Sequence, residues 1–225
     1  NDFNLVGNPY PSAISMTTFF DQNALVRDIM LWTHQTVISG GNTGEFTNAD
    51  YIIVNRSGTI TQNPGLPDPD PVIGSSQGFM TRVTSTGNIV FNNTMRIPDA
   101  NNQFYKSEIQ KKSSVAAEGD EDKLWLNLKG SEGDFSQILI AFLEKATDDF
   151  DDQYDSPVSH FFNKRTLFYT HLNDYKLQIN GNGSFSDERT FDLGFETDTK
   201  QDFTINLSKK AGVFLDKDIY LVDHA

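Results

Sequence analysis

The stretch KLWLNLKG, residues 123–130, alternates leucines with other residues at a period of two. Alternate side chains of a β-strand lie on the same face, so Leu124, Leu126 and Leu128 are predicted to share one buried face. Trp125 then lies on the opposite face. This pattern predicts a strand that is at least half buried, and it sets the expectation for the rest of the chain.

Other segments extend the prediction of a chain built from strands. Two of them repeat the alternation and are predicted to be half-buried strands: residues 190–196 and 202–208. Three runs are apolar on both faces, which is typical of strands inside packed sheets: residues 51–55, 136–144 and 217–223. Around these runs, 16 glycines, 8 prolines and many Asn, Asp, Ser and Thr residues favour turns.

Turn and capping residues predict a hairpin and one short helix. Residues 78–84 and 88–92 are expected to pair around a turn that contains Gly87. Ser15 is placed to cap a helix within residues 15–24. The predicted fold class is all-β: a β-sandwich of jelly-roll or Greek-key type, or two stacked sandwiches, with one short helix.

Two connections suggest how the chain is divided. Residues 63–74 carry four prolines, and residues 106–122 are polar and rich in charge. The second connection suits a boundary, so we predict an N-terminal sandwich half at residues 1–110 and a C-terminal half at residues 118–225. One continuous domain, 1–225, is the alternative, because a chain of this length can also build a single core.

Composition and charge exclude several classes of partner. Acidic residues outnumber basic ones by 31 to 18, and the net charge of -13 would repel a phosphate backbone, so we expect no nucleic-acid partner. No apolar run approaches the roughly 20 residues of a membrane helix, so we expect no membrane insertion. The absence of cysteine removes disulfides and thiolate sites. The start lacks a signal-peptide pattern, so we expect either a cytosolic protein or a leader that lies upstream of this sequence.

One motif resembles a catalytic serine site. Residues 74–78, GSSQG, match G-x-S-x-G with Ser76 in the nucleophile position. That motif requires a turn from a strand into a helix, whereas here a proline-rich segment precedes it and a predicted strand follows. The histidines show no spacing typical of metal ligands: His34, His160, His171 and His224. We therefore predict that the chain is not an enzyme.

The segment ATDDFDDQYDSP, residues 146–157, concentrates carboxylates. Its candidate metal ligands are Asp148, Asp149, Asp151, Asp152 and Asp155. Calcium takes about six to eight oxygen ligands, so this density suits Ca²⁺, although the spacing does not match an EF-hand. The alternative is a solvated acidic loop in which Phe150 and Tyr154 pack inward. Beyond this Ca²⁺ hypothesis, no cofactor is predicted.

Aromatic side chains offer a second candidate site. Exposed aromatic rings on a sheet can stack on sugars, and Trp32 and Trp125 are the candidate ligand-binding residues, with Tyr169 and Tyr175 also available. In a phenylalanine-rich sandwich, both tryptophans are more typical of core residues than of a sugar platform. Glycan binding and core packing therefore remain alternatives at this point.

Several segments, taken in order, resemble a β-rich module of large Bacteroidetes surface proteins that the type IX secretion system exports. The matching segments are FNLVGNPYPSAI (3–14), GSSQGFM (74–80), VFNNTMRI (90–97), KLWLNLKG (123–130), ATDDFDDQYD (146–155), FDLGF (191–195) and IYLVD (219–223). In that family the module lies just ahead of the C-terminal sorting domain. The resemblance covers essentially the whole chain, and none of its segments is catalytic.

The resemblance implies a location outside the cell or on the bacterial cell surface. The implied partners are the upstream domains of the same polypeptide and the secretion machinery. We therefore expect a noncatalytic structural or adhesion module that spaces and presents upstream domains. The alternative is a carbohydrate-binding β-sandwich module that binds glycans and carries a calcium site in residues 148–155.

Overall fold

The computed structural model describes residues 3–33, 50–64, 71–98, 100, 121–159 and 166–223. The fold is all-β, as predicted, with one short α-helix among the described residues. The elements in chain order are β1 (Phe3–Gly7), β2 (Ala13–Ser15), α1 (Met16–Gln22), β3 (Val26–Trp32), β4 (Tyr51–Asn55), β5 (Gly58–Thr61), β6 (Val72–Ile73), β7 (Gly78–Val83), η3 (Asn93–Met95), β8 (Arg96–Ile97), β9 (Asp122–Gly130), β10 (Phe135–Phe142), β11 (Ser156–Pro157), β12 (Thr166–Leu172), β13 (Tyr175–Asn182), β14 (Leu193–Thr197), β15 (Phe203–Ala211) and η4 (Gly212–Asp216). The elements η3 and η4 are short 3₁₀ helices of three and five residues.

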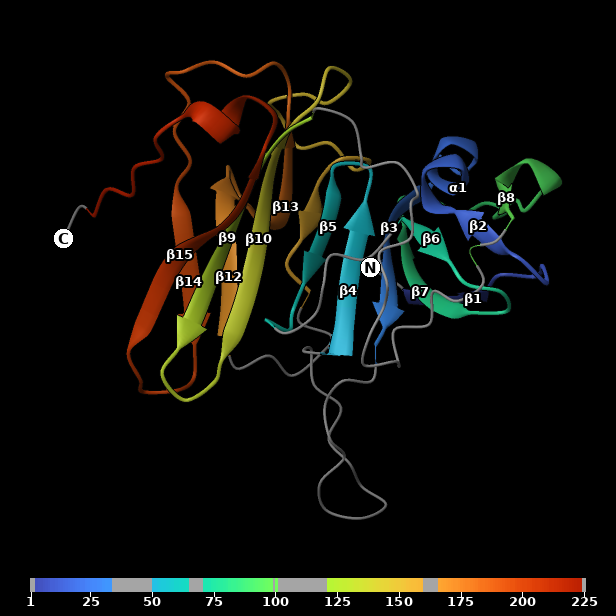
Figure 1. The fold of residues 1–225 in the computed structure, drawn as a ribbon, viewed down its shortest axis with the longest axis horizontal. Helices are drawn as coiled ribbons and strands as arrows, with labels where there is room; N and C mark the ends of the chain where they lie inside the picture. The colour runs from blue at the N-terminus through green and yellow to red at the C-terminus, as the bar shows by residue number, and fades with distance from the viewer. Residues whose placement is uncertain are drawn as a thin grey trace, which may run out of the picture.

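The N-terminal part of the chain forms a five-stranded antiparallel sheet in the order β1-β7-β3-β4-β5. One face of this sheet packs on α1 and on a small sheet of order β6-β2-β8 (Figure 1). Phe19 of α1 and Phe79 of β7 meet edge to face in this first core, with their ring centroids 5.6 Å apart. The predicted helix cap is confirmed, because Ser15 Oγ accepts a hydrogen bond from the Thr18 amide at 3.2 Å.

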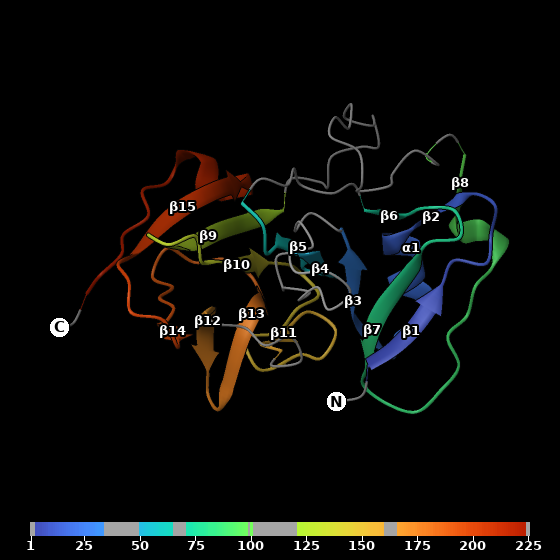
Figure 2. The same cartoon turned by 90° about the horizontal axis from the view of Figure 1, so that it is seen from below.

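The C-terminal part forms a curled sheet in the order β14-β12-β13-β10-β9-β15. The pair β10–β13 is parallel, and the other pairs of this sheet are antiparallel. Figure 2 shows β15, β9 and β10 passing over β14, β12 and β13, so the sheet folds back on itself. The two opposite edges meet where the rings of Phe195 and Phe203 lie 5.4 Å apart. The curl encloses a second core that is lined by phenylalanines.

The stretch at residues 123–130 is buried on both faces. Leu124, Leu126 and Leu128 face the inside of the curl, as the alternation predicted. The opposite face is also covered, because Trp125 packs in a third core that includes Met30 of the five-stranded sheet. This strand therefore lies between the second core and the third core. We call the contact between the outer face of the curled sheet and the five-stranded sheet the junction.

The two parts of the chain keep separate sheets and share the third core. The strands of the five-stranded and three-stranded sheets come from residues 3–97, and those of the curled sheet from residues 122–211. The predicted boundary between residues 110 and 118 lies outside the described residues, so that division stays a prediction. No helix in the described part of the chain is long and apolar enough to span a membrane.

Two predictions about strands are wrong. Residues 88–92 form no hairpin with β7, because β1 and β3 already occupy both edges of β7. Instead, the backbone of Val90 pairs with the side chain of Asn23, at 2.7 and 3.0 Å. Residues 217–223 form no strand, and Tyr220 is 82% exposed there. An apolar run is therefore not sufficient to predict a buried strand.

Candidate functional site

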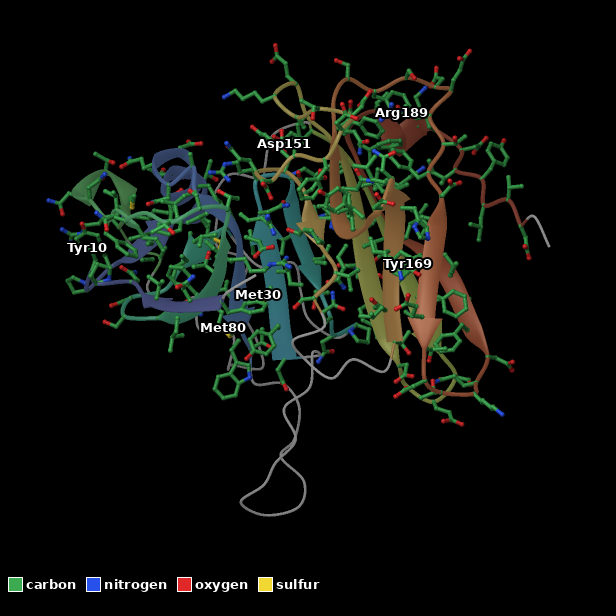
Figure 3. All side chains as sticks on the ribbon, turned by 180° about the vertical axis from the view of Figure 1, so that it is seen from behind. Tyr10, Met30, Met80, Asp151, Tyr169 and Arg189 are labelled. Atoms are coloured by element: carbon green, nitrogen blue, oxygen red, sulfur yellow. The ribbon has the colours of Figure 1, made fainter. Side chains whose placement is uncertain are left out.

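The acidic loop, residues 146–157, lies at the junction. It follows β10 of the curled sheet and ends in β11, which pairs with β13. In Figure 3 the labelled Asp151 lies between the five-stranded sheet and the curled sheet. The loop is therefore part of the C-terminal half of the chain and is placed to contact the N-terminal half.

Backbone oxygens of the acidic loop accept hydrogen bonds from the turn between β4 and β5. The Tyr154 carbonyl accepts from Asn55 Nδ2 at 2.8 Å and from Ser57 Oγ at 2.6 Å. Asn55 Oδ1 also accepts from the Ser57 amide at 2.8 Å, which fixes the turn in the shape that the loop contacts. The turn and the loop are thus held together by buried or partly buried polar contacts.

Two arginines of the five-stranded sheet also bind the loop. Arg82 forms a buried ion pair with Asp28 of the neighbouring strand, and its Nη1 donates to the Pro157 carbonyl at 3.0 Å. Arg27 forms an ion pair with Asp152. The loop therefore contacts β3, β7 and the β4–β5 turn at once.

An aromatic stack extends the same contact. Phe150 of the loop stacks on Tyr175 at the start of β13, with ring centroids 3.9 Å apart and planes 7° from parallel. The Arg27 guanidinium lies over the Phe150 ring of this stack, 5.9 Å from its centroid. A cation over an aromatic ring is attracted to it, so this contact adds to the ion pair of Arg27.

Asp155 is the most deeply buried carboxyl of the loop. It is 0% exposed, and it accepts hydrogen bonds from the Asp151 amide at 2.7 Å and the Gly181 amide at 2.8 Å. The pKa of Asp155 is raised to about 7, mainly by burial; the two amide donors oppose this rise, and the nearby Asp151 and Asp152 add to it. This carboxyl therefore titrates near neutral pH at the centre of the loop.

The structure does not bring the five candidate calcium ligands together. Asp148 forms hydrogen bonds with both Nη atoms of Arg189, at 3.0 and 2.9 Å, away from the ion pair of Asp152. Asp149 is exposed. Among the residues that the structure describes, no three His, Cys, Asp or Glu side chains form a group that could hold a metal ion. The expectation of a solvated loop is also wrong for Asp155, which is buried.

The two tryptophans have different surroundings. Trp125 is 5% exposed, its Nε1 donates to the Thr59 carbonyl at 2.8 Å, and Lys209 Nζ lies 4.7 Å from its ring centroid. Its ring is thus a core group, which disfavours the expected role as an exposed sugar platform. Trp32, at the end of β3, is 44% exposed.

The rings of the other two aromatic candidates, Tyr169 and Tyr175, are in contact with other side chains. Tyr169 is 5% exposed and lies beneath Lys176, whose Nζ is 5.0 Å from the ring centroid. Tyr175 takes part in the stack with Phe150.

Ser76 lies in a turn between two strands. Its φ is 57°, and the Gln77 amide donates to the Gly74 carbonyl at 3.1 Å to close the turn from β6 to β7. The strand-to-helix context that the serine motif requires is therefore replaced by a strand-to-strand turn. His171 lies on β12 beside Tyr169. The remaining histidines, His34, His160 and His224, lie outside the described residues.

Sequence reasoning missed the residues that receive the acidic loop. Asp28 stands within the apolar strand VRDIMLW, and Arg82 stands within GFMTRV. Charged residues inside an otherwise apolar strand are the signal that could have found them, because a buried charge needs a partner. Asn55 and Ser57 carry a weaker signal, since such residues are common in turns.

Neither the curated proteins nor the solved structures gave a significant match. A family whose description reads "Domain of unknown function (DUF8693)" matches residues 1–225. The chain therefore belongs to the DUF8693 family.

Proposed function

We propose that this chain is a noncatalytic structural and adhesion module of a type IX secreted cell-surface protein, and that it spaces and presents the domains upstream of it. The observation that supports the proposal most directly is the docking of the acidic loop across the junction. The loop reaches Arg27, Asn55, Ser57 and Arg82 through hydrogen bonds and ion pairs.

A spacer has to keep its two ends in a fixed relation. Domains that share a small polar interface usually move relative to each other, whereas a large apolar interface restricts that motion. Here the junction combines an apolar core, to which Met30 and Leu139 contribute, with the docked loop beside it. The apolar core supplies the attraction, and the directional polar contacts fix the register of one sheet on the other.

The net charge supports a role at an exposed surface. At -13, it keeps the chain soluble and opposes unspecific association with other acidic surfaces. The segments that resemble type IX secreted proteins supply the proposed location. Surface proteolysis and antibody labelling of intact cells that express the natural full-length protein test that location, and a signal that appears only after cell lysis would refute it.

A distance measurement tests the spacer role. The chain has no cysteine, so Leu5→Cys and Leu215→Cys place two spin labels on exposed positions, one in each half. If the junction is rigid, double electron–electron resonance will give one narrow distance distribution. The double change Asn55→Ala and Ser57→Ala should broaden it, because the loop loses two of its donors. A broad distribution in the unmodified junction would refute the proposal.

Carbohydrate binding is the second candidate function. The half-exposed ring of Trp32 supports it, because an aromatic face on a sheet can stack on a sugar. A glycan array measured with the wild type and with Trp32→Ala tests it. Glycan binding that persists in Trp32→Ala would exclude this ring as the binding surface.

A further inference from the structure

A pocket lies at the far end of the N-terminal half from the junction. It has a volume of about 240 Å³, and its lining residues come from the segment before β2, from η3 and from β8: Ser12, Asn93, Arg96, Ile97 and Pro98. We call it the Arg96 pocket. Tyr10, labelled in Figure 3, lies on the outer side of the small sheet at this end of the molecule. None of the contacts of the acidic loop involves these residues.

The arginine of this pocket, Arg96, is exposed, and two contacts orient its guanidinium. Arg96 Nε donates to Ser12 Oγ at 2.9 Å, and the guanidinium lies over the Tyr10 ring, 5.6 Å from its centroid. The turn beneath is fixed by Asn8, which is 3% exposed and whose Nδ2 donates to the carbonyls of Ser12 and Gly74 at 2.9 Å each. The GNPYPS turn of the sequence therefore serves as a rigid support for this guanidinium.

The guanidinium of Arg96 differs from the others that the structure describes. The other four bind acidic side chains or backbone carbonyls through their Nη atoms: Arg27, Arg56, Arg82 and Arg189. Within the described part of the chain, the two Nη atoms of Arg96 have no acceptor. A fixed guanidinium with two available donors matches the geometry of a carboxylate, which it can bind through two parallel hydrogen bonds.

We propose that the Arg96 pocket binds a carboxylate-bearing sugar, that is, a uronic acid residue. Arg96 binds the carboxylate, and the side chains of Ser12 and Asn93 lie within the same lining to bind ring hydroxyls. Ile97 and Pro98 supply an apolar surface for the C–H face of the ring. At about 240 Å³ the pocket is smaller than the roughly 300 Å³ of the smallest drug-sized sites, so it suits a single ring.

This inference goes beyond the proposed spacer role and does not depend on it. A spacer that also binds an acidic sugar would attach the upstream domains to an acidic glycan. The net charge of -13 repels an acidic sugar from most of the surface. The oriented cation of Arg96 would therefore restrict binding of the carboxylate to this pocket. The spin-label distance measurement and a titration with an acidic sugar can therefore fail independently.

The test is a titration of the whole chain, followed by amide chemical shifts, with three probes: D-glucuronate, D-glucose and inorganic phosphate. Glucuronate is expected to saturate with a dissociation constant on the order of 1 mM, which is usual for a ligand of this size. The shifts should concentrate at Tyr10, Ser12, Asn93 and Arg96. Glucose, which lacks the carboxylate, and phosphate, which lacks the ring, should each bind at least about tenfold more weakly.

Two variants and one control complete the test. Arg96→Gln removes the cation, and Asn93→Asp, at an exposed position, adds a repelling carboxylate; each should weaken glucuronate binding about tenfold or more. Lys129→Gln removes one exposed positive charge on the curled sheet and should leave the binding unchanged. Should Arg96→Gln fold poorly, Asn93→Asp still decides. Unsaturable glucuronate binding, equal affinity for phosphate, or unchanged binding in both variants would overturn the proposal.

Discussion

The buried ion pair Asp28–Arg82 provides the sharpest test of how the junction is held. Asp28 is 0% and Arg82 is 4% exposed, and Arg82 Nε lies 2.9 Å from both carboxylate oxygens. Asp28→Asn removes the negative charge and leaves the Arg82 guanidinium buried without a counter-ion. Breaking a buried pair in this way costs roughly 3–5 kcal/mol of unfolding free energy. A loss of this size is a large fraction of the roughly 5–15 kcal/mol that stabilises a domain.

The double variant Asp28→Leu with Arg82→Met separates the two roles of the arginine. Replacing both charges by apolar groups of similar size is close to neutral within the sheet. The remaining loss is the hydrogen bond from Arg82 Nη1 to the Pro157 carbonyl, which is about 1–3 kcal/mol. We therefore expect the double variant to be more stable than the single variant Asp28→Asn, by roughly 2 kcal/mol.

Urea unfolding followed by tryptophan fluorescence measures these differences, because Trp125 lies in the shared core and reports on the junction. The exposed ion pair of Asp187 with Lys217 is the matched control, and Asp187→Asn should change the unfolding free energy by less than about 1 kcal/mol. If the double variant is as unstable as Asp28→Asn, the unpaired charge is not the cause of the loss, and this account of the junction is wrong.

Three further predictions concern the acidic loop. The raised pKa of Asp155, about 7 against 3.8, stabilises the fold fully below pH 3.8, and this contribution is lost as the pH rises through about 7. Urea unfolding at about pH 4 and pH 8 measures this loss. Between these pH values the unfolding free energy of the wild type should fall by up to roughly 4 kcal/mol more than that of Asp155→Asn. Parallel pH profiles of the two proteins would contradict this. Gly181→Ala would place a Cβ 2.7 Å from Tyr154 Cβ and should cost about 1–3 kcal/mol, whereas Gly7→Ala, with nothing within 4 Å, should show no such clash in the same assay. Calcium at about 5 mM should leave the melting temperature within about 1 °C; a larger rise that Asp151→Asn abolishes would show that the loop binds the ion.

Local patterns predicted the strands better than the way in which they are arranged. The alternation around Leu126 identified a real strand and its inner face, because a period of two is a property of the strand itself. Whether the outer face was solvent or a second sheet depended on Met30, about a hundred residues earlier in the chain. No local pattern carries that information, so the burial of Trp125 could not be deduced.

The acidic loop shows the same limit for a site. The density of aspartates is evident from the sequence. Whether these carboxylates bind calcium, water or positively charged side chains depends on which groups the fold brings near them. Arg27 and Arg82 belong to strands of the other half, so their approach to residues 146–157 follows from the packing of the two sheets. A density of like charge thus predicts that partners are needed, and the fold determines which partners they are.

The position of the positive charges explains why an acidic loop lies at this junction. Arg27, Arg56 and Arg82 all lie on the side of the five-stranded sheet that meets the loop, and burial lowers the pKa of Arg56. A purely apolar junction could slide, since hydrophobic attraction has no direction. Arg27 and Arg82 instead need acceptors at fixed positions, and the loop supplies the Asp152 carboxylate and the Pro157 carbonyl. Arg56 donates to backbone carbonyls of its own half. A shift of one sheet by a single residue would break the Arg27–Asp152 ion pair and the hydrogen bond from Arg82 to the Pro157 carbonyl, whereas Arg82 would keep its pair with Asp28. The polar contacts therefore contribute specificity more than strength, and the proposed spacer role requires that specificity.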